Sequence, residues 1–596
     1  MKLKVLYKKI KNAIDNPYFS LIHAVWHYGK QWRYSIIGYY SALVVAQVFL
    51  SFGPFAFGKA IDTLQNFRPG QLSKVVFWLL ASVAVQLLFW LFHGPARVVE
   101  RTVALKIQQA FRLHVYQQLT RLPLKWHQNH HSGNILTRVN RSSTALYRFA
   151  EDQFKYAQTI VKFVVSIGFL LWISPPIGLI SFFCSFLVMA VVILFDRKLI
   201  PLYEAENNIE NHIGSVLFDY ISNMTTVLTL RLGELTHSNL FQRMMSVWPF
   251  FRKNVILNES KWFSMMILFS IVQTAILIGY AVHSLNTMRV IMLGTVVMIF
   301  RYQWELSSVF QELSMCYGDI VRMNTDVKSI DPILEDIKRL AHIPQGAAVA
   351  RQWHVIEINN LIFHHASEER GQVFNGISFK IKQGEKVALI GLSGGGKSTL
   401  MNLLSGLYTP SHVELKIDGI SFNTLEPLQA ITTLIPQDPE IFENTIAFNI
   451  TMDLPTESEQ IYQVVELAGF SQVLHALPAG LHTDIREKGL NLSVGQKQRL
   501  ALARGLFAAR FSSLILMDEP TSSVDLPTER QILSGIIKAF PRAALMISLH
   551  RLHLLPKFDS VIMLSEGQVI TAGPVVELLN KPGPVQTLWQ AYQQSV

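Results

Sequence analysis

The stretch GLSGGGKST, from Gly391 to Thr399, decides the fold of the C-terminal part of the chain. It fits the pattern G-x-x-x-x-G-K-[ST] and lies between an apolar run, VALI at 387–390, and a helix-like run, LMNLL at 400–404. A strand, a glycine-rich loop and a helix in this order form a phosphate-binding loop. The sequence therefore predicts an α/β domain that binds a nucleoside triphosphate.

Each residue type in this stretch, which we call the phosphate loop, has a chemical reason to be there. Glycines let the backbone curl so that successive N–H groups point at phosphate oxygens, and the following helix adds its dipole. Lys397 can reach the terminal phosphates and Ser398 can ligate Mg²⁺. The alternative is a glycine-rich turn with a surface lysine. The predicted nucleotide-binding residues are Gly391, Ser393, Gly394, Gly395, Gly396, Lys397, Ser398 and Thr399.

A second apolar run, LILM at 514–517, ends in two acidic residues, Asp518 and Glu519. A run of this length and composition is typical of a buried strand. A carboxylate at its end can hold Mg²⁺, and a second one can activate a water molecule. These two residues give the predicted nucleotide site a metal ligand and a general base.

Four further motifs accompany these elements: IPQDPEIF with Gln437, LSVGQKQRL at 492–500, TSSVD ending at Asp525, and SLHRL with His550. Together, in this order, they resemble the nucleotide-binding domain of ATP-binding cassette (ABC) transporters. The resemblance covers residues 354–596. LSVGQ, which we call the signature loop, is its most discriminating part, because many other nucleotide hydrolases with a phosphate loop lack it.

The resemblance implies a role for each matching residue. It implies that Glu519 is the general base, that His550 touches the γ-phosphate, and that Gln437 senses the metal and the attacking water. The implied metal ligands are Ser398, Gln437 and Asp518. The implied contacts to ATP bound on an opposite subunit are Ser493, Gly495 and Gln496, with Asp525 lining the same interface.

We therefore expect ATP and Mg²⁺ as cofactors and a second half-transporter chain as partner. Since both Glu519 and His550 are retained, a homodimer is the simpler expectation, and a heterodimer remains open. Two positions depart from the family pattern. Val494 replaces a glycine of the usual signature loop, and His365, beside His364, falls where the family has a tyrosine that stacks on adenine. A histidine ring can also stack on a base. The alternative is a solvent-facing histidine in a loop.

The first half of the chain predicts a membrane domain. The 596 residues are 50% hydrophobic and only 16% charged, against about 25% charged in soluble proteins. Six apolar segments approach the ~20 residues that a membrane-spanning helix needs. They lie near 35–58, 75–94, 157–174, 177–195, 260–284 and 290–312. The predicted fold is thus a six-helix, exporter-type membrane domain (1–330), a linker (331–353) and an α/β ATPase domain (354–596).

Basic residues set the expected orientation. Between residues 97 and 148, in the long connection between the second and third spans, nine lysines and arginines stand against a lone Glu100, whereas the expected outer loops are short. This positive-inside bias predicts a multi-pass protein of a bacterial inner membrane with both termini and the ATPase domain in the cytoplasm. The basic N-terminal segment lacks a signal-peptide core and is expected to be retained. Membrane lipids are expected partners, and nucleic acid is not, since charge alone does not indicate it.

Charged residues inside the spans are the only sequence signal for the substrate. Lys162 lies ~18 Å from the outer end of the third span at 1.5 Å per residue, and Arg301 lies at a similar depth in the sixth. They either line a cavity and meet an anionic group, or are structural, with Arg301 paired to Glu305 at i, i+4 and Lys162 reaching toward the membrane surface.

The expected function is ATP-driven outward movement of a small amphipathic substrate such as a lipid, a peptide or a hydrophobic compound. The alternatives are an importer built on the exporter fold and an ATP-gated channel or regulator. Glu519 argues against the channel, because gating needs only slow hydrolysis.

Overall fold

The computed structural model divides the chain into a helical unit, residues 1–120 and 131–339, and a C-terminal unit, residues 121–130 and 340–596. The two units are described separately. The structure describes residues 16–130, 132–287, 290–340, 352–364, 372–392, 394–438, 440–485 and 492–595.

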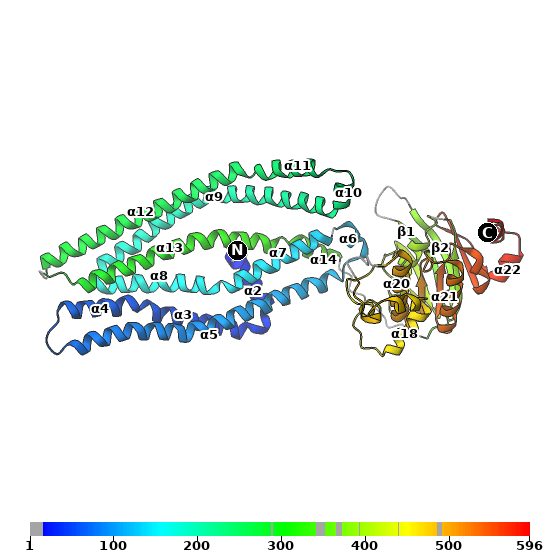
Figure 1. Cartoon of the computed structure of the whole chain (residues 1–596), viewed down its shortest axis with the longest axis horizontal. Coiled ribbons are helices and arrows are strands. Elements are labelled where there is room, and N and C mark those ends of the chain that lie inside the picture. The colour runs from blue at the N-terminus through cyan, green and yellow to red at the C-terminus, as the bar shows by residue number, and fades with distance from the viewer. Residues whose placement is uncertain are drawn as a thin grey trace, which may run out of the picture. The chain divides into compact units, whose positions relative to one another are not determined.

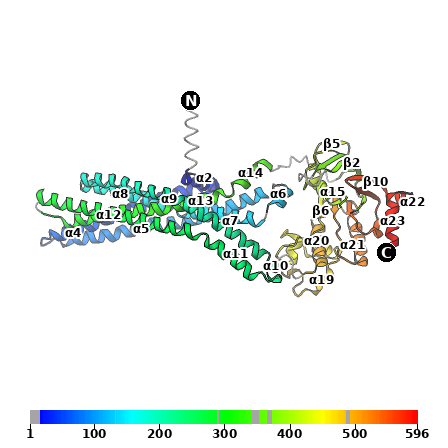
Figure 2. The ribbon, with the colours of Figure 1, turned by 90° about the horizontal axis from the view of Figure 1, so that it is seen from above.

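The helical unit consists of long helices that lie side by side (Figure 1 and Figure 2). Its first helices are α2 Pro17–Tyr28, η1 Lys30–Trp32, α3 Arg33–Ser51, α4 Gly53–Gln65 and α5 Leu72–Leu119. Next come α7 Ser132–Glu151, α8 Gln153–Ile173, α9 Pro175–Ser222, α10 Met224–Thr229 and α11 Gly233–Met245. The last are α12 Trp248–Thr287, α13 Leu293–Lys328 and α14 Asp331–Leu340. The first ten residues of the predicted linker are thus the helix α14.

Proline explains where two of these helices end. Pro54 follows the break between α3 and α4, and it lacks the N–H that would continue the hydrogen-bond ladder. Pro175 likewise starts α9 one residue after α8 ends, with Ser174 extended between them. Both prolines lie in the first turn of the new helix, where a missing N–H costs nothing.

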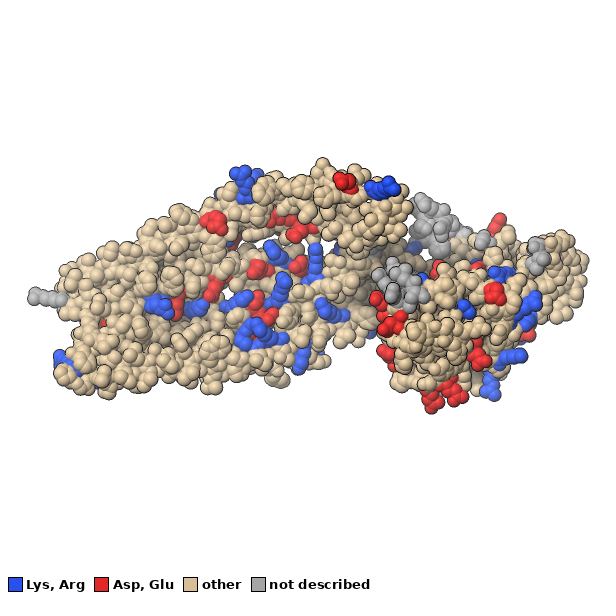
Figure 3. All heavy atoms as spheres, in the orientation of Figure 1, with Lys and Arg blue, Asp and Glu red and all other residues tan. Residues whose placement is uncertain are grey.

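Among the residues that the structure describes, five helical stretches are long and apolar enough to cross a membrane: 30–65, 72–119, 132–173, 175–222 and 233–287. The sixth expected span falls in α13, which carries Arg301 and Glu305 in its apolar part. On the face in Figure 3, charged side chains are sparse over the half of the helical unit that holds α4 and gather over the half toward α7 and α11. This division is what a membrane-embedded half and an aqueous extension require.

Small residues bring α4 and α13 into close contact. A Cβ atom added at Gly294 would lie 1.9 Å from the carbonyl oxygen of Gly58, so only glycine fits there. Asp62 then accepts hydrogen bonds from the backbone N–H and the hydroxyl of Thr295, both at 3.2 Å. Glycine contacts and interhelical hydrogen bonds are the usual means of packing helices within a membrane.

The C-terminal unit contains the short helix α6 Leu124–Asn129 and two β-sheets. The first sheet is antiparallel, with the order β2-β1-β4-β5; the second has the order β10-β9-β3-β8-β7-β6. The strands of the two sheets together are β1 Val355–His364, β2 Gln372–Lys382, β3 Lys386–Ile390, β4 His412–Ile417, β5 Ile420–Phe422, β6 Thr432–Ile435, β7 Leu514–Met517, β8 Ala544–Ser548, β9 Ser560–Ser565 and β10 Gln568–Pro574.

Helices cover the second sheet and complete its core. They are α15 Lys397–Leu404, α16 Glu426–Gln429, α17 Ile446–Thr451, α18 Ser458–Leu467, α19 Ser471–Ala476, η2 Gly480–His482, α20 Val494–Ala509, α21 Leu526–Ala539, η4 Leu552–Lys557, α22 Val575–Asn580 and α23 Pro584–Ser595. Every residue of β3, β7 and β8 is buried. Such continuous apolar strands are expected of a parallel sheet with both faces covered.

Candidate nucleotide site

The topology of the second sheet brings the predicted catalytic motifs to one edge. Strand β3 pairs in parallel with β8, β8 with β7, and β7 with β6. All four therefore end at the same edge. The phosphate loop follows β3, Gln437 follows β6, Asp518 and Glu519 follow β7, and His550 follows β8. Ligands of open α/β sheets bind at this carboxyl edge.

The phosphate loop has a backbone that only glycine permits at two points. Gly391 has φ 147°, and a Cβ atom there would lie 2.1 Å from the carbonyl oxygen of Leu564. Gly396 caps α15 with φ 99°, against the ring of Phe374. The buried ammonium of Lys397 donates to the carbonyls of Gly391 at 3.0 Å and Leu392 at 3.3 Å, which places it inside the loop. Ser393 lies outside the described residues.

Asp518 is fixed by a residue that sequence reasoning missed. The hydroxyl of Ser548 donates to the Asp518 carboxylate at 2.7 Å, and the two side chains are 1% and 6% exposed. The same hydroxyl accepts the backbone N–H of Glu519 at 2.8 Å. This contact follows from the pairing of β7 with β8, which places Met517 opposite Ile547 and so brings Asp518 beside Ser548.

Glu519 has a left-handed backbone, with φ 45°. This conformation is rare outside glycine, asparagine and aspartate, and it is common at active sites. Its carboxylate accepts a hydrogen bond from the amide of Gln437 at 3.0 Å. The structure thus brings together the predicted base and the residue predicted to sense the attacking water.

Gln498 is the second residue that sequence reasoning missed. Its buried amide donates to the carbonyl of Glu519 at 3.0 Å and to the hydroxyl of Ser522 at 2.9 Å, and it accepts the N–H of Ser523 at 2.9 Å. It lies in α20, the helix that begins at the signature loop. One side chain therefore joins that helix to the loop after β7.

The signature loop forms the start of α20. Ser493 and Gln496 form a capping box: the Ser493 hydroxyl accepts the backbone N–H of Gln496, and the side-chain amide oxygen of Gln496 accepts the backbone N–H of Ser493. A Cβ atom at Gly495 would lie 2.8 Å from the carbonyl oxygen of Ser523, so glycine is needed there. Val494, the departure from the family pattern, is 66% exposed and contacts little.

Asp525 caps the next helix, α21, by accepting the N–H of Thr528 at 3.2 Å. Hydrogen bonds from the side chain and backbone of Thr528 lower the pKa of the exposed Asp525 carboxyl. His550 is exposed at the carboxyl edge. Its neighbour Arg551 donates to the carbonyl of Val524 at 2.8 Å and so connects the two loops.

The described residues fit Mg²⁺ with a nucleotide. Asp518 supplies a buried carboxylate, and Ser398, in the first turn of α15, supplies an exposed hydroxyl. Gln437 supplies an amide beside Glu519. Oxygen ligands of this kind suit Mg²⁺. His365, the predicted adenine contact, lies outside the described residues, and its neighbour His364 is exposed at the end of β1.

The membrane charges have different partners from those expected. Lys162 forms an ion pair with Glu312 at 2.7 Å, and Glu305 accepts the hydroxyl of Ser166 at 3.1 Å. Arg301 is exposed, and in the part of the chain that the structure describes it forms no ion pair with Glu305. The alternative in which Arg301 and Glu305 form an ion pair at i, i+4 is therefore not what these two residues show. The two residues are neighbours along α13, but Glu305 bonds to α8.

Two family models match the chain. Residues 36–306 match the model of the ABC transporter transmembrane region, and residues 374–522 match the model described as ABC transporter. Among solved structures, a bacterial Atm1-family ABC exporter with ATP bound is similar at a TM-score of 0.77 and 21% identity, covering 95% of this chain and 99% of that one. This likeness concerns the fold.

Two curated relatives show the range of the similarity. An ATM1-type heavy metal exporter of Novosphingobium aromaticivorans is 24% identical, over 90% of this chain and 88% of that protein. The rat ATP-binding cassette sub-family B member 6 is 27% identical, over 81% of this chain. The alignment spans 58% of that rat protein's own length.

Proposed function

The chain belongs to the ABC transporter family, as an exporter-type half-transporter, and from this premise we propose that it couples ATP hydrolysis to the outward movement of an amphipathic compound across a membrane. The observation that carries the proposal is the contact between Gln437 and Glu519 beside the Asp518–Ser548 pair, at the edge where the phosphate loop ends. One edge thus holds a base, a metal ligand and a phosphate cradle.

In this proposal Glu519 takes the proton of the attacking water, and Gln437 orients that water. The phosphate loop and Lys397 hold the β- and γ-phosphates, and His550 contacts the γ-phosphate. Ser398, Gln437 and Asp518 would hold Mg²⁺, which would supply the positive charge that neutralises the phosphates. Preorganised charges and donors of this kind supply most of the catalysis in phosphoryl transfer.

The working unit is proposed to be a dimer. The chain has one ATPase domain, and the signature loop and Asp525 are expected to act on ATP held by a second chain. Ser493, Val494 and Asp525 are exposed, as residues that await a partner surface must be. The chain keeps both Glu519 and His550, which supports two identical sites in a homodimer.

We propose a bacterial inner membrane with the ATPase domain in the cytoplasm, on the strength of the positive-inside bias. The substrate class is the open part of the proposal. The name of the Novosphingobium relative favours a second candidate, a heavy metal. Within the residues that the structure describes, no group of three or more His, Cys, Asp or Glu could hold a metal ion.

The test is ATP hydrolysis and transport by the full chain in liposomes, with and without lipids, peptides, hydrophobic compounds and heavy metal ions. We expect Mg²⁺-dependent hydrolysis that one class stimulates, and ATP-dependent movement of that class. Glu519→Gln is the matched control and should abolish both. A folded dimer that binds ATP but hydrolyses none of it would overturn the proposal. Hydrolysis without movement of any compound would favour a channel or regulator.

A further inference from the structure

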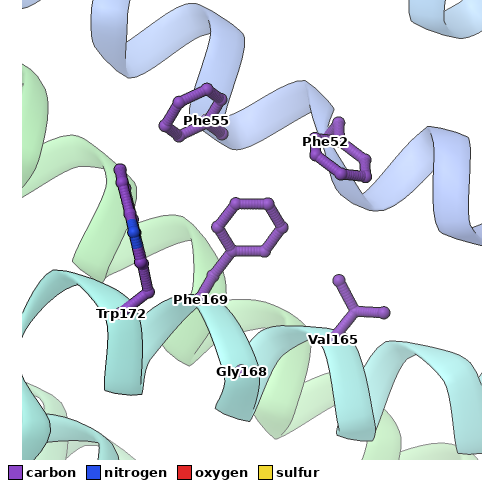
Figure 4. Close-up of a pocket in the computed structure, with 6 residues that line it drawn as sticks. All are labelled: Phe52, Phe55, Val165, Gly168, Phe169 and Trp172. Atoms are coloured by element: carbon purple, nitrogen blue, oxygen red, sulfur yellow. The ribbon is translucent and has the colours of Figure 1, made fainter.

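An aromatic pocket lies between α4 and α8, outside the nucleotide site. Its volume is about 440 Å³, within the range of pockets that hold small molecules. Figure 4 shows Phe52 and Phe55 on one side and the residues of α8 on the other. The lining residues are Phe52, Phe55, Val165, Gly168, Phe169 and Trp172. We call this set the aromatic pocket.

The shape of the pocket follows from the sequence. The helix break at Phe52 precedes Gly53 and Pro54, so α3 and α4 do not form one straight helix there. On the opposite wall Gly168 has no side chain, and a Cβ atom added to it would meet nothing within 4 Å. The break and the glycine together leave space where packed helices ordinarily have none.

The rings of the pocket are held in place by contacts with one another. Phe55 lies 5.6 Å from Phe169 and 5.5 Å from Trp172, between ring centroids, and Phe52 lies 5.2 Å from Phe169. Behind them Phe169 stacks on the buried ring of Tyr302 at 4.9 Å. The walls are therefore fixed, whereas Phe52 and Trp172 are 42% and 63% exposed and reachable from the surface of the helical unit.

The cation of Lys59 lies at the rim of the pocket. The ammonium of Lys59 is 5.8 Å from the ring centroid of Phe55 and 6.0 Å from that of Trp172. Its nearest acidic neighbour along α4, Asp62, is bonded to Thr295. Over the described ranges, Lys59 has no ion pair with a carboxylate. A positive charge above an apolar pocket is complementary to a molecule with an acidic head and an apolar tail.

The position along the helices fits a lipid. Lys59 lies six residues before α4 ends at Gln65, or ~9 Å at 1.5 Å per residue. Trp172 is next to the last residue of α8. Lysine and tryptophan near the ends of membrane helices lie where headgroups meet acyl chains.

We propose that the aromatic pocket binds an anionic phospholipid, with one acyl chain over Gly168 against the exposed rings of Phe52 and Trp172, and the negatively charged headgroup on Lys59. This goes beyond the proposed transport function and does not depend on ATP. The pocket supplies apolar area for any acyl chain, and Lys59 supplies the preference for a negative headgroup.

The test is photolabelling of the full chain in vesicles without nucleotide. Phosphatidylglycerol and phosphatidylcholine, each with a photoreactive acyl chain, are compared, and labelled peptides are mapped. We expect phosphatidylglycerol to label residues 165–172 about five-fold more, since one lysine near a membrane surface contributes about 1 kcal/mol to anionic lipid binding. Lys59→Gln should remove that preference and Lys59→Arg should keep it.

Filling the pocket provides the second arm. Gly168→Leu should reduce labelling of 165–172 by both lipids. Gly279→Leu is its matched control, because Gly279 is another membrane-helix glycine with open space beside it, in α12. It should label like the wild type. Equal labelling by the two lipids in the wild type, or unchanged labelling in a folded Gly168→Leu variant, would overturn the proposal. Circular dichroism and gel filtration check folding. ATP hydrolysis is measured separately, so failure here leaves the transport proposal standing.

Discussion

Glu519, the proposed general base, has a left-handed backbone conformation that costs about 1–3 kcal/mol in a non-glycine residue. Two neighbours stabilise this conformation: the Ser548 hydroxyl accepts its N–H, and the Gln498 amide donates to its carbonyl. The carboxylate is therefore presented to Gln437 by strand β8 and helix α20, not by its own loop alone. Substitutions at Ser548 or Gln498 should therefore affect ATP hydrolysis, just as substitutions at Glu519 itself should.

Glu519→Gln tests the assignment of the base. The amide cannot accept the proton of water, and losing a general base costs about 10²–10⁴-fold in rate. ATP affinity should stay near that of the wild type, because the phosphate loop is untouched. Single-turnover hydrolysis and equilibrium ATP binding measure the two effects. A hydrolysis rate close to that of the wild type would show that Glu519 is not the base.

Ser548→Ala tests the support of Asp518. The change removes a hydrogen bond to a charged group, an interaction of about 1.5–3 kcal/mol, and leaves Asp518 less well fixed. We expect the Mg²⁺ concentration for half-maximal hydrolysis to rise, with metal-free ATP binding unchanged. Ser565→Ala, at the end of strand β9 in the same sheet, is the control for the loss of a hydroxyl. An unaltered Mg²⁺ dependence in Ser548→Ala would contradict this role.

Among elements, α20 is the one whose position matters most for the site. Its N-terminus carries the signature loop and packs on the loop after β7 through Gly495. Gly495→Ala adds a methyl group against the Ser523 carbonyl, and overpacking of this kind costs about 1–3 kcal/mol. We expect lower ATP hydrolysis and a lower unfolding temperature.

Val494→Ala is the matched change one residue away. Val494 is 66% exposed, and substitutions at such positions are usually within about 0.5 kcal/mol of neutral. Differential scanning fluorimetry of the two variants compares them directly. Equal unfolding temperatures for Gly495→Ala and the wild type would contradict the tight contact.

The contact between α8 and α13 gives a second prediction at this scale. Lys162→Gln leaves Glu312 without its partner, and breaking such a partly buried pair should cost ~1–3 kcal/mol. Arg301→Gln removes no ion pair and should leave stability within about 0.5 kcal/mol. Thermal unfolding in detergent measures both. If Arg301→Gln proved the more destabilising, the pairing of Lys162 with Glu312 would be contradicted.

The sequence predicted elements better than contacts between them. Local patterns are enough to predict the phosphate loop, the two acidic residues after β7 and the position of Gln437, because each of these follows a short apolar strand. Ser548 and Gln498 could not be found in this way, since their roles depend on strand pairing and on α20 reaching the loop after β7. Lys162 and Glu312 are 150 residues apart, and helical spacing detects only neighbours within one helix.

The helix lengths also exceed the predicted spans for a physical reason. Apolar windows detect the part of a helix that lipid requires, such as 75–94 within α5, whereas α5 continues to Leu119 with polar residues on its surface. The polar part of such a helix forms no apolar window, so hydropathy cannot locate the residue at which the helix ends. The same holds for α9 and α12.

For the whole molecule, we propose that two chains share each ATP site. The phosphate loop and the signature loop lie on separate elements, α15 and α20. Ser493 is exposed, so a second ATPase domain can contact it. If so, a defect in one motif of one chain should be compensated by a partner whose defect is in the other motif.

The most direct test is ATP hydrolysis by a purified heterodimer of a Ser493→Arg chain and a Lys397→Ala chain, each with a different affinity tag. One site then has an intact phosphate loop and an intact signature loop, and the other has neither. We expect clear hydrolysis by the heterodimer and rates at least about ten-fold lower for both parent homodimers. A ten-fold lower rate corresponds to a loss of about 1.4 kcal/mol of transition-state stabilisation. Wild-type hydrolysis by the Ser493→Arg homodimer would contradict a shared site.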